Sequence, residues 1–446
     1  MNVQPIISRL CQYVEARNFA GYDPYDALNS PLLRAGSLGT KWGRIAAIQF
    51  MKRCPLNLRP LLLCRPGHNP KAIGLFLHGY VRLRRAGKIS HGLSGDASAK
   101  PGGMGGTEAD IRHIDHLLAL LDALRSPGYS GNGWGYNFDW QSRAAYVPRG
   151  TPTIVNTAFI GHALLDTWEW LGNTKALDLA LPIADFMLND LNRLGDGDRF
   201  CFSYTPQDHN YVHNANLLGA SVLARIAGIG GSGQALGVSG RRTEDGRRKA
   251  GERGRSTVGG KRKAEERTSN IEHPTSNIER ETALKALRYS MKHQRPDGSW
   301  PYAETVFQGW IDSFHTGFNL QAIKVFLDLG LAEECREGFE KGVRYYADTF
   351  FLPDGTPKYY HDRVYPVDIH CPAQALVFFS SLAPRYDALC ERLLKWMLAN
   401  LWDEKQGYFY FQKTRRFTNR IPYIRWAQAW ALHGLTAYRC RDRESG

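Results

Sequence analysis

Several patterns that mark common protein classes are missing from this sequence of 446 residues. No run of apolar residues approaches the length of about 18 that a membrane-spanning helix requires. The N-terminal stretch MNVQPIISRLCQYVEARNF lacks the apolar core and cleavage site of a signal peptide. The eight cysteines form no CxxC pair and do not cluster, which is typical of reduced, mostly buried thiols. These absences predict a cytoplasmic protein without a membrane span.

Metal-binding pairs at close spacing are also missing. The sequence has no HxH and no HExxH, so we expect neither a bound metal nor another cofactor. Three histidines brought together by the fold remain an alternative route to a metal site.

Positive charge is in excess, with a net charge of +14. Residues 231–280 hold 12 Lys/Arg and 7 Asp/Glu, which leaves +9 for the remaining chain. A basic body favours an acidic glycan, a phosphate-bearing substrate, nucleic acid or a lipid surface as partner, and a merely solvated basic surface is the plain alternative. The basic cluster of Arg82, Arg84, Arg85 and Lys88 leaves a peripheral membrane role open.

Residues 231–280 differ from the rest of the chain. They contain no Phe, Tyr, Trp or Cys and only five Val, Ile or Leu. Such a segment cannot bury enough apolar surface to fold. We therefore predict one domain, 1–446, with a disordered low-complexity insertion at 231–280 that takes no part in the chemistry. A basic nucleic-acid arm is the alternative interpretation, but we expect no nucleic-acid partner.

The most informative stretch is DGSWPYAETVFQGWIDSFHTGF at 297–318, because its pattern recurs. It has a glycine turn, aromatic residues that alternate as a strand would, a polar loop and the start of a helix. Turn glycines followed by aromatic residues occur at Gly133, Gly197, Gly298, Gly355 and Gly407. Their spacing of about 50 to 65 residues, once the insertion is removed, indicates a repeat architecture.

Each unit reads as two helices and a loop, so the expected fold is all-α: an (α/α)6 toroid of helical hairpins with short aromatic β-turn loops on one rim. Inner helices are expected to start near residues 154, 211, 313, 368 and 423. Outer helices are expected at 174–194, 281–294, 333–349 and 385–401, and N-terminal helices at 5–19, 40–53, 70–86 and 107–125.

Equivalent units would place the N-termini of the inner helices on one rim, where residues distant in sequence converge. The aligned residues are Asn156, His213, His315, His370 and Arg425. We predict the catalytic residues to be His315, His370, Asp312, Asp368, His213 and Tyr211. We predict the substrate-binding residues to be Arg425, Tyr423, Asn156, Trp310, Trp140 and Trp426.

Two chemistries fit this set of residues. Asp312 and Asp368 could serve as general acid and base in glycoside cleavage. Alternatively, the histidines and tyrosines could move a proton beside a substrate carboxylate held by Arg425, as in a uronate epimerase or lyase. The plain alternative is that each histidine only caps a helix or satisfies a polar group.

Two short motifs resemble known toroidal families. The segment Gln294–Trp300, QRPDGSW, resembles the QW motif of squalene–hopene cyclases. The segment Asp312–Thr316, DSFHT, resembles the D-x-x-H-T segment of protein prenyltransferase β subunits. Both resemblances imply an α/α toroid. Their chemistry does not carry over, because the chain has no DxDD and no D-x-C upstream of His315.

A resemblance covers nearly the whole chain outside 231–280. It rests on GYDPYDALNSP at 21–31, LPDGTPKYY at 352–360 and VDIH at 367–370. These look like a bacterial family associated with polysaccharide-biosynthesis clusters, often labelled δ-aminolevulinic acid dehydratase, and similar to six-hairpin glycosidase-like toroids. That label implies a TIM barrel with catalytic lysines, which nothing in this sequence fits.

The favoured hypothesis is a carbohydrate-active enzyme that acts on an anionic, uronate-type glycan, with epimerase or lyase chemistry ahead of hydrolysis. The second is a non-catalytic glycan-binding subunit of a polysaccharide synthesis or export machine. The third is a terpenoid or prenyl-group enzyme, which would require an apolar central cavity.

Overall fold

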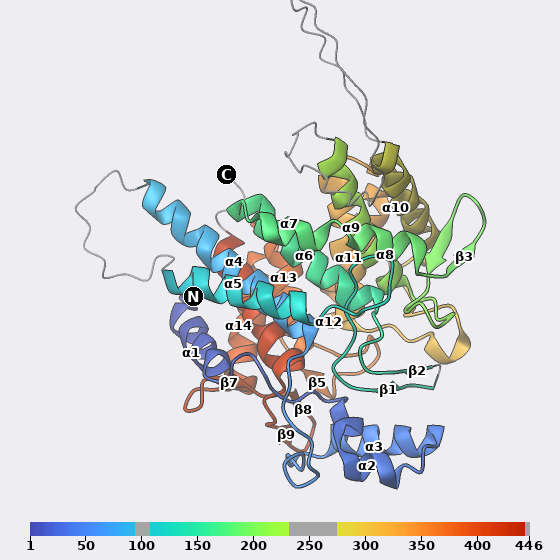
Figure 1. The fold of residues 1–446 in the computed structure, drawn as a ribbon. Helices are drawn as coiled ribbons and strands as arrows, with labels where there is room; N and C mark the ends of the chain where they lie inside the picture. Colours follow the sequence, from blue (N-terminus) through green and yellow to red (C-terminus); the bar gives the residue numbers. More distant parts are fainter. Residues whose placement is uncertain (94–107, 144, 232–273, 442–446) are drawn as a thin grey trace, which may run out of the picture.

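The computed structural model describes residues 1–93, 108–143, 145–231 and 274–441 (Figure 1). Six inner helices each pack against the next, and the last packs back on the first, which closes a ring. In ring order they are α4 (Pro70–Leu93), α6 (Ile154–Leu171), α9 (His213–Gly231), α11 (Ser313–Asp328), α13 (His370–Ser380) and α15 (Trp430–Cys440). The last inner helix is preceded by a π-helical segment, η4 (Ile424–Ala429).

A second layer of helices surrounds this ring, one position for each inner helix. The outer helices are α5 (Glu108–Ala123) on α4, α7 (Thr174–Ala180) with α8 (Ile183–Asn189) on α6, α10 (Pro274–Lys292) on α9, α12 (Arg336–Phe350) on α11, α14 (Asp387–Leu401) on α13, and α1 (Gln4–Glu15) on α15. The predicted (α/α)6 toroid is therefore confirmed, and it differs from the TIM barrel implied by the family label.

The inner helices are buried on all sides, whereas the outer helices bury only one face, and their sequences differ accordingly. In α6, every residue from Ile154 to Thr167 is buried, because the helix has neighbours on all sides. The outer helix α12 is strongly amphipathic and buries only the stripe that faces the ring. Side-chain caps fix the start of two inner helices: Thr153 accepts the amide of Asn156, and Asp312 accepts the amide of His315.

Three of the five predicted turn glycines adopt the left-handed conformation. Gly298, Gly355 and Gly407 have φ of 94°, 88° and 73°, which a residue with a side chain rarely adopts. Gly133 is required for a different reason, since a Cβ there would lie 2.8 Å from Pro152. Gly197 has open space around it and a φ outside the left-handed range. The repeat was therefore read correctly, although its turns are not identical.

Short strands form the loops on the rim where the inner helices begin. They are β1 (Trp140–Gln141), β2 (Tyr146–Val147), β3 (Arg193–Gly195), β4 (Phe200–Phe202), β5 (Val367–Asp368), β6 (Trp402–Asp403), β7 (Tyr408–Phe409), β8 (Gln412–Lys413) and β9 (Thr418–Asn419). The expected strand around Trp300 is reduced to a single bridge between Val212 and Ala303.

An N-terminal segment extends from this rim. It contains η1 (Asp26–Asn29), α2 (Pro31–Gly36) and α3 (Lys41–Arg53), and Figure 1 shows α2 and α3 apart from the toroid. Ala27, Leu28, Ile48 and Met51 form a small core of their own. The sequence predicted α3 but not α2, which buries no residue.

Several other expectations can be compared with the structure. Helix α10 begins at Pro274, so residues 274–280 are helical and do not belong to the insertion. Residues 232–273 of the predicted insertion lie outside the described residues. None of the eight cysteines, all of which lie in the described ranges, forms a disulfide, and seven are buried, as expected. No helix in the described ranges combines the length and the apolar character needed to cross a membrane.

Candidate active site

The N-termini of the inner helices surround a cavity of about 280 Å³. Aromatic side chains from the rim loops form much of its wall, with a few polar groups between them, as in many small-molecule sites. Seven of the twelve predicted site residues line it: Trp140, Trp310, Asp312, His315, His370, Arg425 and Trp426.

His315 is held by the residue that caps its own helix. Its Nδ1 lies 2.6 Å from Oδ2 of Asp312, and the indole Nε1 of Trp310 donates to the same oxygen at 3.1 Å. An Nδ1–H that donates to the carboxylate leaves Nε2 for the cavity. This arrangement is that of a histidine prepared to give or take a proton.

His370 lies in the same wall, and its imidazole ring makes no hydrogen bond to a described residue. Its ring stacks on Phe314 at 4.3 Å and lies edge-on to Trp426 at 4.9 Å. Both ring nitrogens are buried and unpaired within the described part of the chain. Burial, together with the charges of Lys71 and Arg425, keeps the pKa of His370 well below its usual range. The ring is therefore neutral, and its polar atoms are left for a ligand.

Lys71 is a buried basic side chain in the cavity that the sequence analysis did not predict. Its Nζ lies over the rings of Phe159, Phe318 and Trp430 at 4.1, 5.3 and 5.5 Å. No described carboxylate or hydrogen-bond acceptor pairs with it. Burial lowers its pKa well below the usual value and Arg425 adds to this effect. An anion in the cavity would supply the missing counter-charge.

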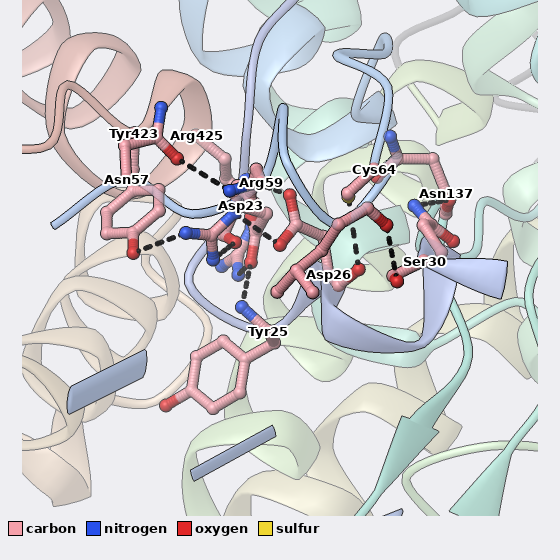
Figure 2. Close-up of polar contacts among 12 residues, drawn as sticks. Asp23, Tyr25, Asp26, Ser30, Asn57, Arg59, Cys64, Asn137, Tyr423 and Arg425 are labelled. Carbon is pink, nitrogen blue, oxygen red and sulfur yellow. Dashed lines mark hydrogen bonds and ion pairs between the residues drawn. The ribbon is translucent and has the colours of Figure 1, made fainter. Parts of the chain in front are cut away.

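Arg425, the predicted substrate anchor, already has a partner. Its Nε and Nη2 donate to the two carboxylate oxygens of Asp23 at 2.6 and 2.8 Å, and both side chains are buried (Figure 2). Burial alone would lower the pKa of Arg425, but the charge of Asp23 outweighs it and raises that pKa. Arg425 therefore lines the cavity as half of a neutral ion pair.

A second buried pair supports the first (Figure 2). Arg59 donates through Nε to Asp26 at 2.7 Å, through Nη2 to the backbone oxygen of Asp23 at 2.7 Å, and through Nη1 to the Tyr423 hydroxyl at 2.9 Å. The segment 23–26 is part of the motif GYDPYDALNSP. Its structural role is to tie the N-terminal segment to the start of η4, next to the cavity.

Asp368 does not line the cavity. Its Oδ1 accepts the indole N–H of Trp426 at 2.7 Å and the backbone N–H of His370 at 2.9 Å. It therefore orients two residues that do line the cavity. Burial raises the pKa of Asp368 to about 7, against its usual 3.8, and the hydrogen bonds from His370 and Trp426 act in the opposite direction.

The raised pKa of Asp368 predicts a pH-dependent difference between the wild type and Asp368→Asn. Between about pH 4 and pH 7 the folded protein keeps a proton that the unfolded chain has lost, so wild-type stability falls as the pH rises. The asparagine side chain does not titrate, so the free energy of unfolding of the variant does not fall in this way. Relative to the wild type, it should rise by on the order of 1 kcal/mol per pH unit in that window. Urea denaturation at pH 5 and pH 8 measures it. A difference independent of pH would contradict the raised pKa.

His213 lies outside the cavity, in a separate cluster. Its Nε2 is 4.0 Å from Oε1 of Glu304, and Nε2 of His293 is 3.3 Å from the same oxygen. Nδ1 of His293 bonds the backbone oxygen of Tyr289 at 2.8 Å. Among the described residues, these three side chains are the group that could hold a metal ion. This set contains neither His315 nor His370.

The other predicted residues also lie away from the cavity wall. Both polar atoms of the Asn156 side chain are buried and without a partner. The Tyr423 hydroxyl accepts from Arg59, and the Tyr211 hydroxyl lies 3.1 Å from Nδ1 of His209. The register of the repeats therefore located the rim correctly, but it did not decide which side chains face the cavity.

Three of the unpredicted lining residues lie outside the five predicted repeat units. Lys71 is the second residue of α4, the inner helix that lies outside the five predicted units and lacks the glycine turn that marked them. A closed ring needs six inner helices, so the segment His68–Lys71 could have been compared with the other helix starts. Tyr25 and Lys52 come from the N-terminal extension, outside the repeats.

No protein-family model and no curated protein sequence matches this chain. Solved structures with the same fold do match. A cellobiose 2-epimerase from Bacillus thermoamylovorans B4167 is 11% identical with a TM-score of 0.52, covering 82% of this chain and 87% of its own.

Two further solved structures share the fold. A GH76 α-mannanase from Bacteroides thetaiotaomicron is 10% identical with a TM-score of 0.52, covering 84% of this chain and 87% of its own. An unsaturated glucuronyl hydrolase specific for heparin is 12% identical with a TM-score of 0.52, covering 98% of this chain and 96% of its own.

Proposed function

We propose that this protein is a carbohydrate-active enzyme that moves a proton at the carbon beside the carboxylate of an anionic, uronate-type glycan. The reaction is epimerisation or β-elimination. The observation that carries the proposal is the convergence of an unpaired lysine, an unpaired neutral histidine and an Asp–His dyad in one aromatic-walled cavity.

Substrate binding follows from the charge of the cavity. The Asp23 carboxylate neutralises Arg425, and Lys52 bonds the Tyr25 hydroxyl, so Lys71 is the basic group available to a substrate carboxylate. A bound carboxylate favours the protonated form of Lys71, because opposite charges attract strongly in a poorly solvated site. The aromatic rings of Trp140 and Trp310 offer flat surfaces for the apolar faces of a sugar.

In the proposed reaction, the two cavity histidines exchange protons with one carbon of the substrate. Neutral His370 takes the proton from the carbon beside the substrate carboxylate, and the electron pair of that C–H bond moves into the carboxylate. The Lys71 ammonium stabilises the resulting dianion. The His315 imidazolium returns a proton to the opposite face of that carbon, which gives the epimer. In the alternative β-elimination, the C–O bond on the next carbon breaks, its oxygen takes the proton of the His315 imidazolium and leaves as an alcohol, and the product is an unsaturated uronate.

Hydrolysis by Asp312 and Asp368 has less support. Asp368 lies behind the cavity wall and bonds Trp426, while Asp312 bonds His315 and Trp310. The prenyl-group hypothesis also has less support, because His315 bonds Asp312 and is not part of the metal-capable group found in the described residues. Three of the fold's solved neighbours carry names of sugar-processing enzymes, which favours a sugar substrate by analogy only.

The direct test is proton NMR of the full chain in D2O with a panel of acidic and neutral glycans. Deuterium at C5 of a uronate identifies an epimerase, and new unsaturated-uronate signals identify a lyase. New reducing ends without exchange would refute proton transfer in favour of hydrolysis. Binding without any turnover would instead identify a glycan-binding subunit.

Lys71→Met should abolish recognition of the acid group. We expect an affinity loss of about 100-fold for a uronate oligosaccharide, because a hydrogen bond to a charged group contributes about 1.5–3 kcal/mol. Affinity for the matching neutral oligosaccharide should change little. Isothermal titration calorimetry measures both.

Lys52→Met is the matched control for Lys71→Met. Lys52 also lines the cavity, but its Nζ bonds the Tyr25 hydroxyl at 2.6 Å. Equal losses in the two variants, or equal losses for acidic and neutral glycans, would show that Lys71 does not select the acid.

A further inference from the structure

The N-terminal extension has an unusual surface. We call residues 31–66, which include α2 and α3, the α2–α3 module. Of the nineteen large apolar side chains exposed in the described part of the chain, seven lie in this module: Leu32, Leu38, Trp42, Phe50, Leu56, Leu61 and Leu63. Single exposed apolar residues are normal on a soluble protein, whereas a cluster of this kind marks a contact surface.

Two of these leucines have an uncommon backbone conformation. Leu38 and Leu63 have φ of 51° and 57°, in the left-handed region that bulky residues rarely adopt. Their side chains are 84% and 59% exposed, so packing within the chain does not compensate for the conformation. Both leucines lie in turns and point outward, which suits a contact outside the fold.

Charge indicates the nature of that contact. The sequence has no Asp or Glu between Asp26 and Asp96, while the module holds seven Lys or Arg. Arg59 pairs with Asp26 and Arg34 pairs with Asp139. The other five basic residues of the module are Lys41, Arg44, Lys52, Arg53 and Arg65. Exposed leucines, a tryptophan and basic residues together are typical of segments that lie at the surface of an anionic membrane.

We propose that the α2–α3 module docks on a membrane surface containing anionic phospholipids, with Leu38, Trp42 and Leu61 among the side chains that enter the headgroup region. A second copy of the chain suits this surface less well. A symmetric contact would place the same acid-free basic segment of both copies face to face.

Docking has a consequence for the cavity. Tyr25 precedes the module, Lys52 lies on α3, and both line the cavity. Figure 1 places α2 and α3 on the side of the toroid where the loops of the rim lie. A docked protein would therefore hold the cavity close to the lipid surface, where a glycan carried on a lipid would be presented. The docking itself does not depend on the proposed reaction.

Vesicle co-sedimentation of the full chain tests the proposal. We expect binding to vesicles of phosphatidylcholine with about one third phosphatidylglycerol to be at least about tenfold tighter than to phosphatidylcholine alone, and to weaken with salt. Leu38→Asp combined with Leu61→Asp should lower it by about tenfold or more. Lys41→Glu combined with Arg53→Glu should do the same. Leu194→Asp, an exposed leucine on β3, is the matched control.

Four outcomes would overturn the proposal. These are no binding to anionic vesicles at low salt, equal binding to both vesicle types, wild-type binding by both double variants, and an equal loss in Leu194→Asp. Light scattering provides a separate check. A wild-type dimer that Leu38→Asp with Leu61→Asp converts to a monomer would assign the surface to a second copy.

Discussion

The variant Asp23→Ala should be about 3–5 kcal/mol less stable than the wild type. It removes the only carboxylate paired with Arg425 in the described residues and leaves a buried guanidinium without counter-charge. Removal of one partner of a buried ion pair lowers the free energy of unfolding by this much, because the remaining charge stays buried without a counter-charge. The measurement is the free energy of unfolding in urea, together with the thermal midpoint.

The surface pair Arg34–Asp139 provides the control for Asp23→Ala. Arg34 is 59% exposed, so Asp139→Ala should change stability by less than about 1 kcal/mol. A double variant, Asp23→Leu with Arg425→Met, should recover much of the loss, since it removes both buried charges. A small effect of Asp23→Ala, similar to that of Asp139→Ala, would contradict the assignment of Arg425 as a structural cation.

The variant His315→Ala should have the largest effect on turnover. A positioned acid or base contributes about 10² to 10⁴ in rate, and His315 is the cavity histidine with a carboxylate on its other ring nitrogen. Stability should change little, because the ring is partly exposed to the cavity. The readout is deuterium exchange or product formation on whichever uronate glycan the panel identifies, with circular dichroism to verify the fold.

His361→Ala is the matched control on the same rim. His361 is exposed and does not line the cavity. Asp312→Asn is informative as well, since asparagine can still cap the helix but removes the carboxylate charge beside Nδ1 of His315. Its rate should fall between those of the wild type and His315→Ala. Full turnover in His315→Ala would eliminate the proposed proton donor.

Local pattern was sufficient for most helices of the toroid. The predicted start of α11 at Ser313 and of α6 at Ile154 agree with the structure, because cap residues and apolar spacing are local signals. The start of α10 was placed seven residues late, since Thr275–Arg280 resembles the composition of the insertion more than that of a helix. Helix α2 buries nothing and so leaves no apolar period to recognise.

The candidate site was predicted only in part. Repeat register brought His315, His370 and Arg425 to one rim, because equivalent units point their helix N-termini the same way. It also included His213, whose ring packs against α10 and the loop of Glu304 instead of facing the cavity. Which side chains of an inner helix face the cavity depends on the rotation of the helix about its own axis. Small differences in this rotation between units bring different positions to the cavity.

The sequence by itself determined the all-α repeat, the rim where the candidate cavity lies and the absence of disulfides between the eight cysteines, since each rests on local period or composition. Only the tertiary structure decided how the charges pair. Arg425 is neutralised by Asp23, about 400 residues away along the chain, and Lys71 is left in the cavity without a carboxylate partner among the described residues. Pairing between distant residues depends on chain closure, in which the N-terminal segment packs against the last helix. No local signal encodes that contact.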